Sequence, residues 1–437
     1  MSVGFVSLLL FALLIVLLIS GLPLAFIMGG LATIFSYFLL GPRSLAAIAG
    51  NAYGVMENFV IIAIPLFIFM GVILQRSGIA EDAYELMYKW LGGVRGGLAI
   101  GTVVVCTIFA ALTGTSAAAT ISMGVIALPA MLKRGYNKHL AIGCICAGGT
   151  LGVLIPPSVL MIIYGVFGSE SVGRLFAGGV VAGLVMSFLF MAYIAIKAFL
   201  QPQLAPAIPL EEKVSMREKL VALRGLILPL LLVFGVLGSI FLGVATPTEA
   251  AAIGSLGSVL CAAINHKLTW SVIKETCYQT LQLSGMVVWI ILGSAAFTSL
   301  YASTGAIQLV QESIALLPLS PYLILIGIMF LLFILGMFLD PGAIIMLTVP
   351  IFVPLIKTLG FDPVWFGVLF IVNMQLGYLT PPFGFSLFYM KRIVPEDVTM
   401  GDIYKSVFPF VLIMIVCVIL FVIFPEIIMW LPNRLFE

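Results

Sequence analysis

Oxygen-bearing and small residues gather at four places inside otherwise apolar stretches of the sequence. These are G-T-S at 114–116, G-G-T-L-G at 148–152, D-P-G at 340–342 and N-M-Q-L-G at 373–377. Hydroxyls, amides, carboxylates and backbone carbonyls are the ligands that hard cations prefer. We therefore expect two cation or substrate sites, each formed where two of these places meet. Gly114, Thr115 and Ser116 should approach Gly148, Gly149, Thr150 and Gly152, and Asp340 and Gly342 should approach Asn373, Gln375, Gly377 and Thr380.

The same pattern occurs twice along the chain. L-G-x-L-x-P-P occupies 151–157 and again 376–382, so the two copies stand 225 positions apart. Other residues repeat at that interval: Pro129 with Pro354, Gly135 with Gly360, and Gly29 with Gly254. One interval that relates so many positions predicts an internal repeat.

Tandem prolines and flanking glycines break a helix, and broken helices are costly in a membrane. Irregular backbone persists in hydrocarbon only where protein, water or a bound ion satisfies its polar groups. Two hairpin tips and two broken helices at matching positions are the best sequence indication of a mid-membrane site in a secondary transporter. Freed helix N-termini can also hold an anionic group. The alternative is that the small residues only permit close helix packing.

Composition places the chain in a membrane. Of its 437 residues, 62% are hydrophobic and only 9% are charged, and long apolar segments recur from end to end. The first apolar segment lacks a basic start and a cleavage site, so we expect a retained helix instead of a signal peptide. The net charge of +2 gives no indication of nucleic-acid binding. The six cysteines are expected to be small buried side chains, not a metal site.

The expected fold is an all-α polytopic membrane protein of two inverted repeats, each with a re-entrant hairpin and a broken transmembrane helix. Residues 1–200 form the first repeat, 201–224 a cytoplasmic linker and 225–437 the second repeat. The hairpins lie at about 97–132 and 320–356, and the broken helices at about 139–168 and 362–390. Segments 81–93 and 305–316 are amphipathic and should lie along the interface. The remaining predicted helices are 3–19, 21–40, 59–76, 173–199, 221–243, 247–265, 277–300 and 406–432.

The distribution of basic residues favours inverted repeats over parallel ones. If the halves are inverted, most lysines and arginines fall in loops on one side, which is then cytoplasmic. The first hairpin would enter from the cytoplasm and the second from outside, and both termini would be periplasmic.

Four polar residues have a structural reading, and for Asp340 a functional one stands beside it. Asp340 stands in an apolar stretch, where an acid should face a cavity or a partner. It could bind Na⁺, carry a proton, or cap the helix that begins at Pro341. Glu249 in T-P-T-E is expected to complete a helix start. His139 and His266 are expected to be solvated loop residues.

The motifs together resemble those of the large permease subunit (DctM-type) of the tripartite ATP-independent periplasmic, or TRAP, transporters. The resemblance covers essentially the whole chain. It rests on GTSAAATISMGVIALPAML (114–132), GGTLGVLIPPS (148–158), ATPTEAAAIG (245–254), LDPGAIIMLTVPIFVPL (339–355) and NMQLGYLTPPFGFSLFYMK (373–391).

The resemblance implies a Na⁺-driven, elevator-type carrier of organic acids in a bacterial or archaeal inner membrane. Its partners would be a separate small four-helix membrane subunit and a periplasmic substrate-binding protein. It also implies one sodium site at Thr115, Ser116, Gly149, Thr150 and Gly152, and another at Asp340, Gly342, Asn373, Gln375 and Gly377. The organic acid is expected beside Ser116, Pro156, Pro157, Thr380 and Pro381.

Other functions remain as alternatives. A stand-alone ion-coupled carboxylate carrier of the same architecture would need no binding protein. A channel would show flux without coupling, although paired hairpins favour alternating access. An enzyme is not expected, because the chain has no P-loop, H-E-x-x-H or G-x-S-x-G pattern.

Overall fold

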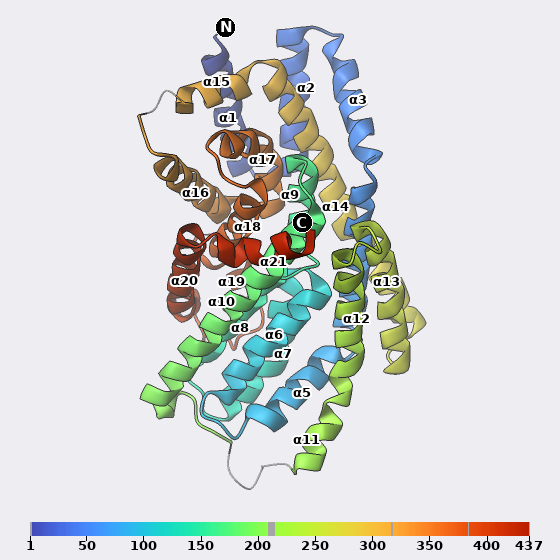
Figure 1. Ribbon diagram of the computed structural model, residues 1–437, viewed down its shortest axis with the longest axis vertical. Helices are drawn as coiled ribbons and strands as arrows, with labels where there is room; N and C mark the ends of the chain where they lie inside the picture. The colour runs from blue at the N-terminus through green and yellow to red at the C-terminus, as the bar shows by residue number, and fades with distance from the viewer. Residues whose placement is uncertain (1, 209–214, 316–317, 383, 437) are drawn as a thin grey trace.

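The fold is an elongated bundle of helices, seen in a computed structural model that describes residues 2–208, 215–315, 318–382 and 384–436 (Figure 1). No strand occurs in those ranges. Eight described helices are long and apolar enough to cross a membrane, and a bent pair would add a ninth. The described residues therefore confirm an all-α polytopic membrane protein.

The first half of the chain contains two short 3₁₀ segments within its helices and a third after them. Its elements are α1 (Val3–Ile19), α2 (Leu24–Leu40), α3 (Ser44–Met56), η1 (Phe59–Ile62), α4 (Ala63–Gln75), α5 (Ile79–Leu91), α6 (Gly97–Thr113), α7 (Ser116–Lys133), α8 (Lys138–Thr150), η2 (Leu151–Val153), α9 (Val159–Gly168), α10 (Val172–Leu200) and η3 (Pro202–Leu204).

The second half repeats this order with matching helices displaced by about 225 positions, except that one continuous helix corresponds to α3, η1 and α4. Its elements are α11 (Met216–Ala222), α12 (Arg224–Phe241), α13 (Pro247–Ile264), α14 (Trp270–Ser303), α15 (Ala306–Ala315), α16 (Pro321–Phe338), α17 (Pro341–Thr358), α18 (Pro363–Leu379), α19 (Phe385–Lys391), α20 (Met400–Ile423) and α21 (Glu426–Phe436).

The predicted hairpins and broken helices are present. α6 and α7 form the first hairpin, and α16 and α17 form the second. Figure 1 shows the first in the lower part of the molecule and the second in the upper part, so they approach from opposite ends. α8 and α9 are separated by the first proline pair, and α18 and α19 by the second. Each proline pair contains a cis peptide bond.

Local signals account for several helix ends. Asp340 and Asp362 accept backbone N–H groups at the starts of α17 and α18, each of which has proline at its first position. Thr246 and Glu249 form the expected capping box at the start of α13. Gly135 and Gly360 follow α7 and α17 with φ of +78° and +84°, a conformation that glycine adopts without strain.

Several predicted elements were wrong. No helix was predicted at 44–56, where α3 lies; it meets the η1–α4 segment at 57°. The helix predicted at 406–432 is divided into α20 and α21, because Pro425 disfavours helical backbone at Phe424. The end of the predicted linker is helical, as α11. Residues 209–214 of that linker, residue 316 of segment 305–316 and residue 383 of the second broken helix lie outside the described residues.

Candidate functional site

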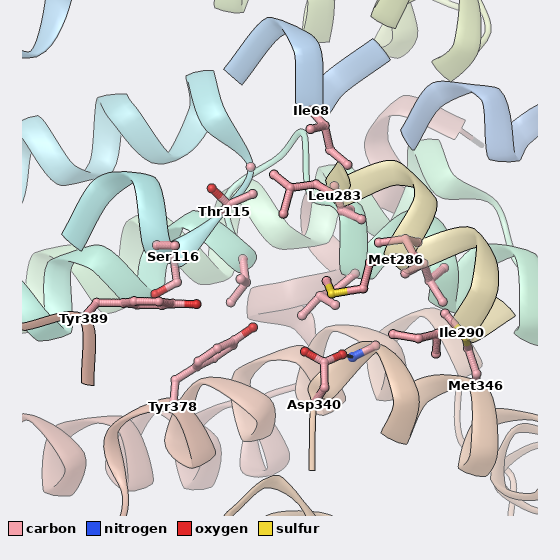
Figure 2. Close-up of a pocket in the computed structure, with 18 residues that line it drawn as sticks. Ile68, Thr115, Ser116, Leu283, Met286, Ile290, Asp340, Met346, Tyr378 and Tyr389 are labelled. Carbon is pink, nitrogen blue, oxygen red and sulfur yellow. Dashed lines mark hydrogen bonds between the residues drawn. The ribbon is translucent and has the colours of Figure 1, made fainter. Parts of the chain in front are cut away.

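The two hairpin tips line one cavity, of about 210 Å³. α7 and α17 both begin at its wall, at Ser116 and Pro341, and Thr115, Ser116, Asp340 and Gly342 are among its lining residues. The opposite wall comes from α4 and α14. The apolar lining residues include Ile68, Leu283, Met286, Ile290 and Met346 (Figure 2).

Asp340 caps α17 and also faces the cavity. Its Oδ1 accepts the backbone N–H of Gly342 at 2.9 Å and that of Ala343 at 3.4 Å. Among the described residues that line the cavity, Asp340 carries the only charged side chain. The capping role expected from the sequence is confirmed. Because capping uses Oδ1, it is compatible with a second role for the carboxylate.

Two tyrosines in the cavity wall were missed by the sequence analysis. Tyr378 lies near the end of α18 and Tyr389 lies on α19, and both line the cavity. Figure 2 shows both hydroxyl groups pointing into the space that Ser116 and Asp340 also line. Tyr378 directly follows Gly377 and occupies the first variable position of the repeated L-G-x-L-x-P-P motif. Its hydroxyl there was the available sign of a residue in the site.

The first hairpin tip packs directly on the first broken helix, as expected. A Cβ at Gly152 would lie 2.5 Å from the Thr115 carbonyl oxygen, so the two backbones touch. A Cβ at Gly114, whose φ is +63°, would collide with the Pro157 carbonyl oxygen. Ser116 Oγ lies 2.9 Å from Ser386 Oγ on α19, which joins this tip to the second broken helix as well. The small residues therefore permit close backbone approach at the tip.

Two buried oxygen atoms beside this junction have no hydrogen-bond partner. One is Thr120 Oγ1, on α7, against which Gly149 of α8 packs so closely that a Cβ would not fit. The other is Gln375 Oε1, on α18. The Gln375 Nε2 atom donates to the Thr150 carbonyl at 2.7 Å, which brings α18 to the first broken helix. Buried oxygens are normally satisfied, so their environment suits a cation.

The second predicted sodium site is more spread out than the first. Gly377 packs on α16, where a Cβ would lie 2.6 Å from the Gly336 carbonyl oxygen. Asn373 Nδ2 donates to the Met329 carbonyl at 2.7 Å, further along α16 from the tip. Asp340 and Gly342 line the cavity, whereas Gln375 joins the first broken helix. The structure thus places two of these five residues against α16, two at the cavity and one against the first broken helix.

Only one of the residues expected beside the substrate lines the cavity among the described residues. That residue is Ser116. The Pro157 carbonyl oxygen packs against Gly114 of the first tip. Thr380 Oγ1 donates to the Leu376 carbonyl at 2.7 Å. Pro156 is buried, and neither it nor Pro381 is in the cavity wall. The prolines therefore shape the helix breaks, while Tyr378 and Tyr389 of the second broken helix reach the cavity wall.

Comparison with known proteins agrees with this architecture. Residues 11–427 match the family described as "Tripartite ATP-independent periplasmic transporter, DctM component". The chain belongs to this family of TRAP transporter large permeases. It is 34% identical to the C4-dicarboxylate TRAP transporter large permease protein DctM of Pseudomonas aeruginosa, over 93% of this chain and 94% of that one. It is therefore a multi-pass membrane permease and not an enzyme.

Other relatives of this large permease carry different substrate names. It is 30% identical to the ectoine TRAP transporter large permease protein TeaC of Halomonas elongata, over 93% of this chain and 99% of that one. Among solved structures, the Alcanivorax borkumensis YdaH transporter has a TM-score of 0.65 at 13% identity, covering 92% of this chain and 96% of that one. That likeness concerns the fold alone.

Proposed function

We propose that this large permease imports an organic acid by coupling its entry to Na⁺, working with a small four-helix membrane subunit and a periplasmic substrate-binding protein. The observation that carries the proposal is the cavity between the hairpin tips. Two helix N-termini reach it, it holds one carboxylate, and none of its described lining residues is basic. An anion there would depend on the helix N-termini and on bound cations.

The residues beside the cavity fit Na⁺ as the coupling ion. In the first site Na⁺ would be held by Thr120, by backbone at Thr115, Gly149 and Gly152, and by Gln375. In the second it would be held near Asp340 and Gly342. Bound Na⁺ supplies positive charge at the hairpin tips. The tips, once ordered, complete a site in which Ser116, Tyr378 and Tyr389 donate hydrogen bonds to the substrate's carboxylate oxygens. Substrate affinity then depends on Na⁺, and Na⁺ affinity depends reciprocally on substrate.

The placement of the cavity also suggests which parts move. One wall consists of the hairpins and broken helices, and the other of α4 and α14. We propose that the hairpins and broken helices slide as one body past a scaffold that includes α4, α14 and the amphipathic α5 and α15. This is the elevator arrangement, with the small subunit bound to the scaffold and both termini periplasmic.

Uptake by proteoliposomes tests the proposed function. Labelled C4-dicarboxylates, sialic acid and other organic acids would be offered to this chain reconstituted with its small subunit, with and without an inward Na⁺ gradient and the cognate binding protein. Uptake that needs both is the expected result. Uptake with Na⁺ alone would favour a stand-alone carrier, and flux without a gradient dependence would favour a channel.

Replacing Thr120 with valine tests the first sodium site separately from transport. Since the Thr120 hydroxyl is buried without a partner, its removal should leave stability without Na⁺ unchanged or slightly higher. Stabilisation by added Na⁺ should decrease, with the half-maximal Na⁺ concentration rising at least about fivefold. Melting curves across a Na⁺ series, with K⁺ as the control ion, measure both effects. A Na⁺ response equal to that of the unmodified chain would exclude Thr120 as a ligand.

A further inference from the structure

A second cavity lies apart from the hairpin tips, where α8 and α20 begin and α10 ends. Its volume is about 320 Å³, within the range of about 300–1,000 Å³ that small-molecule sites occupy. Its polar wall carries His139, Tyr193, Lys197 and Lys405, and its apolar wall includes Phe410. The proposed transport cycle uses none of these residues.

The cavity has an excess of positive charge. Lys197 Nζ donates to the Tyr193 hydroxyl at 3.3 Å and lies 5.6 Å from the centre of the Tyr193 ring. The Lys197 side chain is therefore held beside Tyr193 in the cavity wall. Lys405 is exposed and makes no ion pair with a described residue. No carboxylate is among the described lining residues. Two cations therefore face this space without an acidic partner inside it.

Asp402 is the acid beside this wall, with its Oδ1 4.0 Å from His139 Nε2. Its carboxylate is already engaged, since it completes the capping box with Thr399 at the start of α20 and pairs with Lys138 at 3.2 Å. Glu396 and Asp397 are exposed on the loop before α20 and do not line the cavity. An anion in the cavity would thus meet lysine side chains first.

His139 belongs to the polar wall and is not the solvated loop residue that we predicted. It is the second residue of α8 and is half-buried. Its Nδ1 lies 3.2 Å from the Asp402 carbonyl and 3.1 Å from Ser406 Oγ. The Ser406 hydroxyl also donates to the Asp402 carbonyl at 2.6 Å. These contacts join the start of α8 to the first turns of α20 in the cavity wall.

The helices that carry the two lysines also expose large apolar side chains. On α10 these are Ile196 and Phe199, and on α20 they are Phe408 and Leu412. Side chains of this size on membrane helices contact acyl chains, while neighbouring lysines extend toward the headgroups. The cavity therefore combines a cationic pocket with an apolar flank on each side. Basic pockets between transmembrane helices bind phospholipid headgroups.

We propose that this cavity binds the phosphate headgroup of an anionic phospholipid. Lys197 and Lys405 contact the phosphate oxygens, and the acyl chains run along Phe199 and Phe408. A soluble anion would satisfy the same lysines but would leave the apolar flanks without a role. The bound lipid would join α8, α10 and α20 at the membrane surface.

Native mass spectrometry of the full chain in detergent tests the proposal. The probes are cardiolipin, phosphatidylglycerol, phosphatidylcholine and inorganic phosphate, each added at equal concentration. Each surface lysine favours anionic lipid enough to change affinity about fivefold, so Lys197→Gln/Lys405→Gln should weaken cardiolipin binding about 30-fold. Lys197→Arg/Lys405→Arg should retain it. Lys274→Gln removes one exposed lysine from α14 and is the matched control, expected to change binding less than twofold.

Three results would overturn the proposal. One is equal retention of cardiolipin by the Lys197→Gln/Lys405→Gln variant and the unmodified chain. Another is equal binding of phosphatidylcholine and cardiolipin. The third is displacement of bound lipid by millimolar inorganic phosphate, which would assign the cavity to a soluble anion. Melting temperatures of the variants distinguish loss of the site from loss of the fold.

Discussion

Replacing Gly152 with alanine is expected to reduce Na⁺-dependent uptake about 5- to 150-fold, the range of a typical coupling free energy between two sites. The added Cβ would lie 2.5 Å from the Thr115 carbonyl oxygen and 3.2 Å from the Ser116 nitrogen. Both are backbone atoms, so no side-chain rotation relieves the collision. The first hairpin tip must move away from the first broken helix, and the Thr115 carbonyl moves with it.

Gly377→Ala is the equivalent change in the second half. There the Cβ would lie 2.6 Å from the Gly336 carbonyl oxygen of α16, again a backbone atom. The control is Gly327→Ala, on α16, the helix that Gly377 contacts, where a Cβ would meet no heavy atom within 4 Å. Alanine is favoured over glycine in a helix interior, so the control should be neutral or stabilising.

The measurement is the initial rate of uptake against Na⁺ concentration, together with the melting temperature of each variant. Gly152→Ala should raise the half-maximal Na⁺ concentration, and Gly327→Ala should not. Normal Na⁺ dependence in both Gly152→Ala and Gly377→Ala would mean that the tips tolerate displacement and do not form the ion sites.

The sequence predicted the hairpins well because their ends carry strong local signals. The hairpins were expected at about 97–132 and 320–356, and their second arms were found at Ser116–Lys133 and Pro341–Thr358. Asp340 and Pro341 begin the later one, and Gly135 and Gly360 follow the two arms. Signals of this kind act within a few residues, so they can be read without knowledge of the tertiary structure.

Elements that depend on tertiary context were predicted less well. Asn58 caps η1 and separates α3 from α4, whereas the matching position in the second half is Leu283, inside the continuous helix α14. That difference lets Leu283 and its neighbours on α14 line the cavity. Nothing in the local sequence says that α14 passes the hairpin tips, because its position is set by packing with α2 and α4.

The candidate site was predicted at the level of backbone and less well at the level of side chains. Spacing brought Gly152 to the first tip, because both lie in the same half. The bond from Gln375 to Thr150 crosses between the halves, and so does the contact of Ser116 with Ser386. A repeat indicates that two halves are alike, but it does not say where they meet.

The Asp340→Asn variant is expected to keep its fold and lose Na⁺ coupling. Asparagine caps helices about as well as aspartate, so the contacts with Gly342 and Ala343 can persist. Only the charge is removed. Two unit charges 4 Å apart interact by about 1 kcal/mol in water and about 4 kcal/mol at the effective dielectric constant near a protein surface. The half-maximal Na⁺ concentration should therefore rise between about 5-fold and about 700-fold, with the melting temperature within about 2 °C.

Two further variants separate charge from capping. Asp340→Ala removes both, and it should add a loss of about 0.5–2 kcal/mol in stability to the loss of coupling. Asp362 caps α18 in the same way, through Val364 and Trp365, but it does not line the cavity. Asp362→Asn should therefore leave Na⁺ dependence unchanged. If Asp340→Asn and Asp362→Asn behave alike in uptake, Asp340 is a helix cap alone, and the second Na⁺ must be held by backbone oxygens at the second hairpin tip or not be bound there.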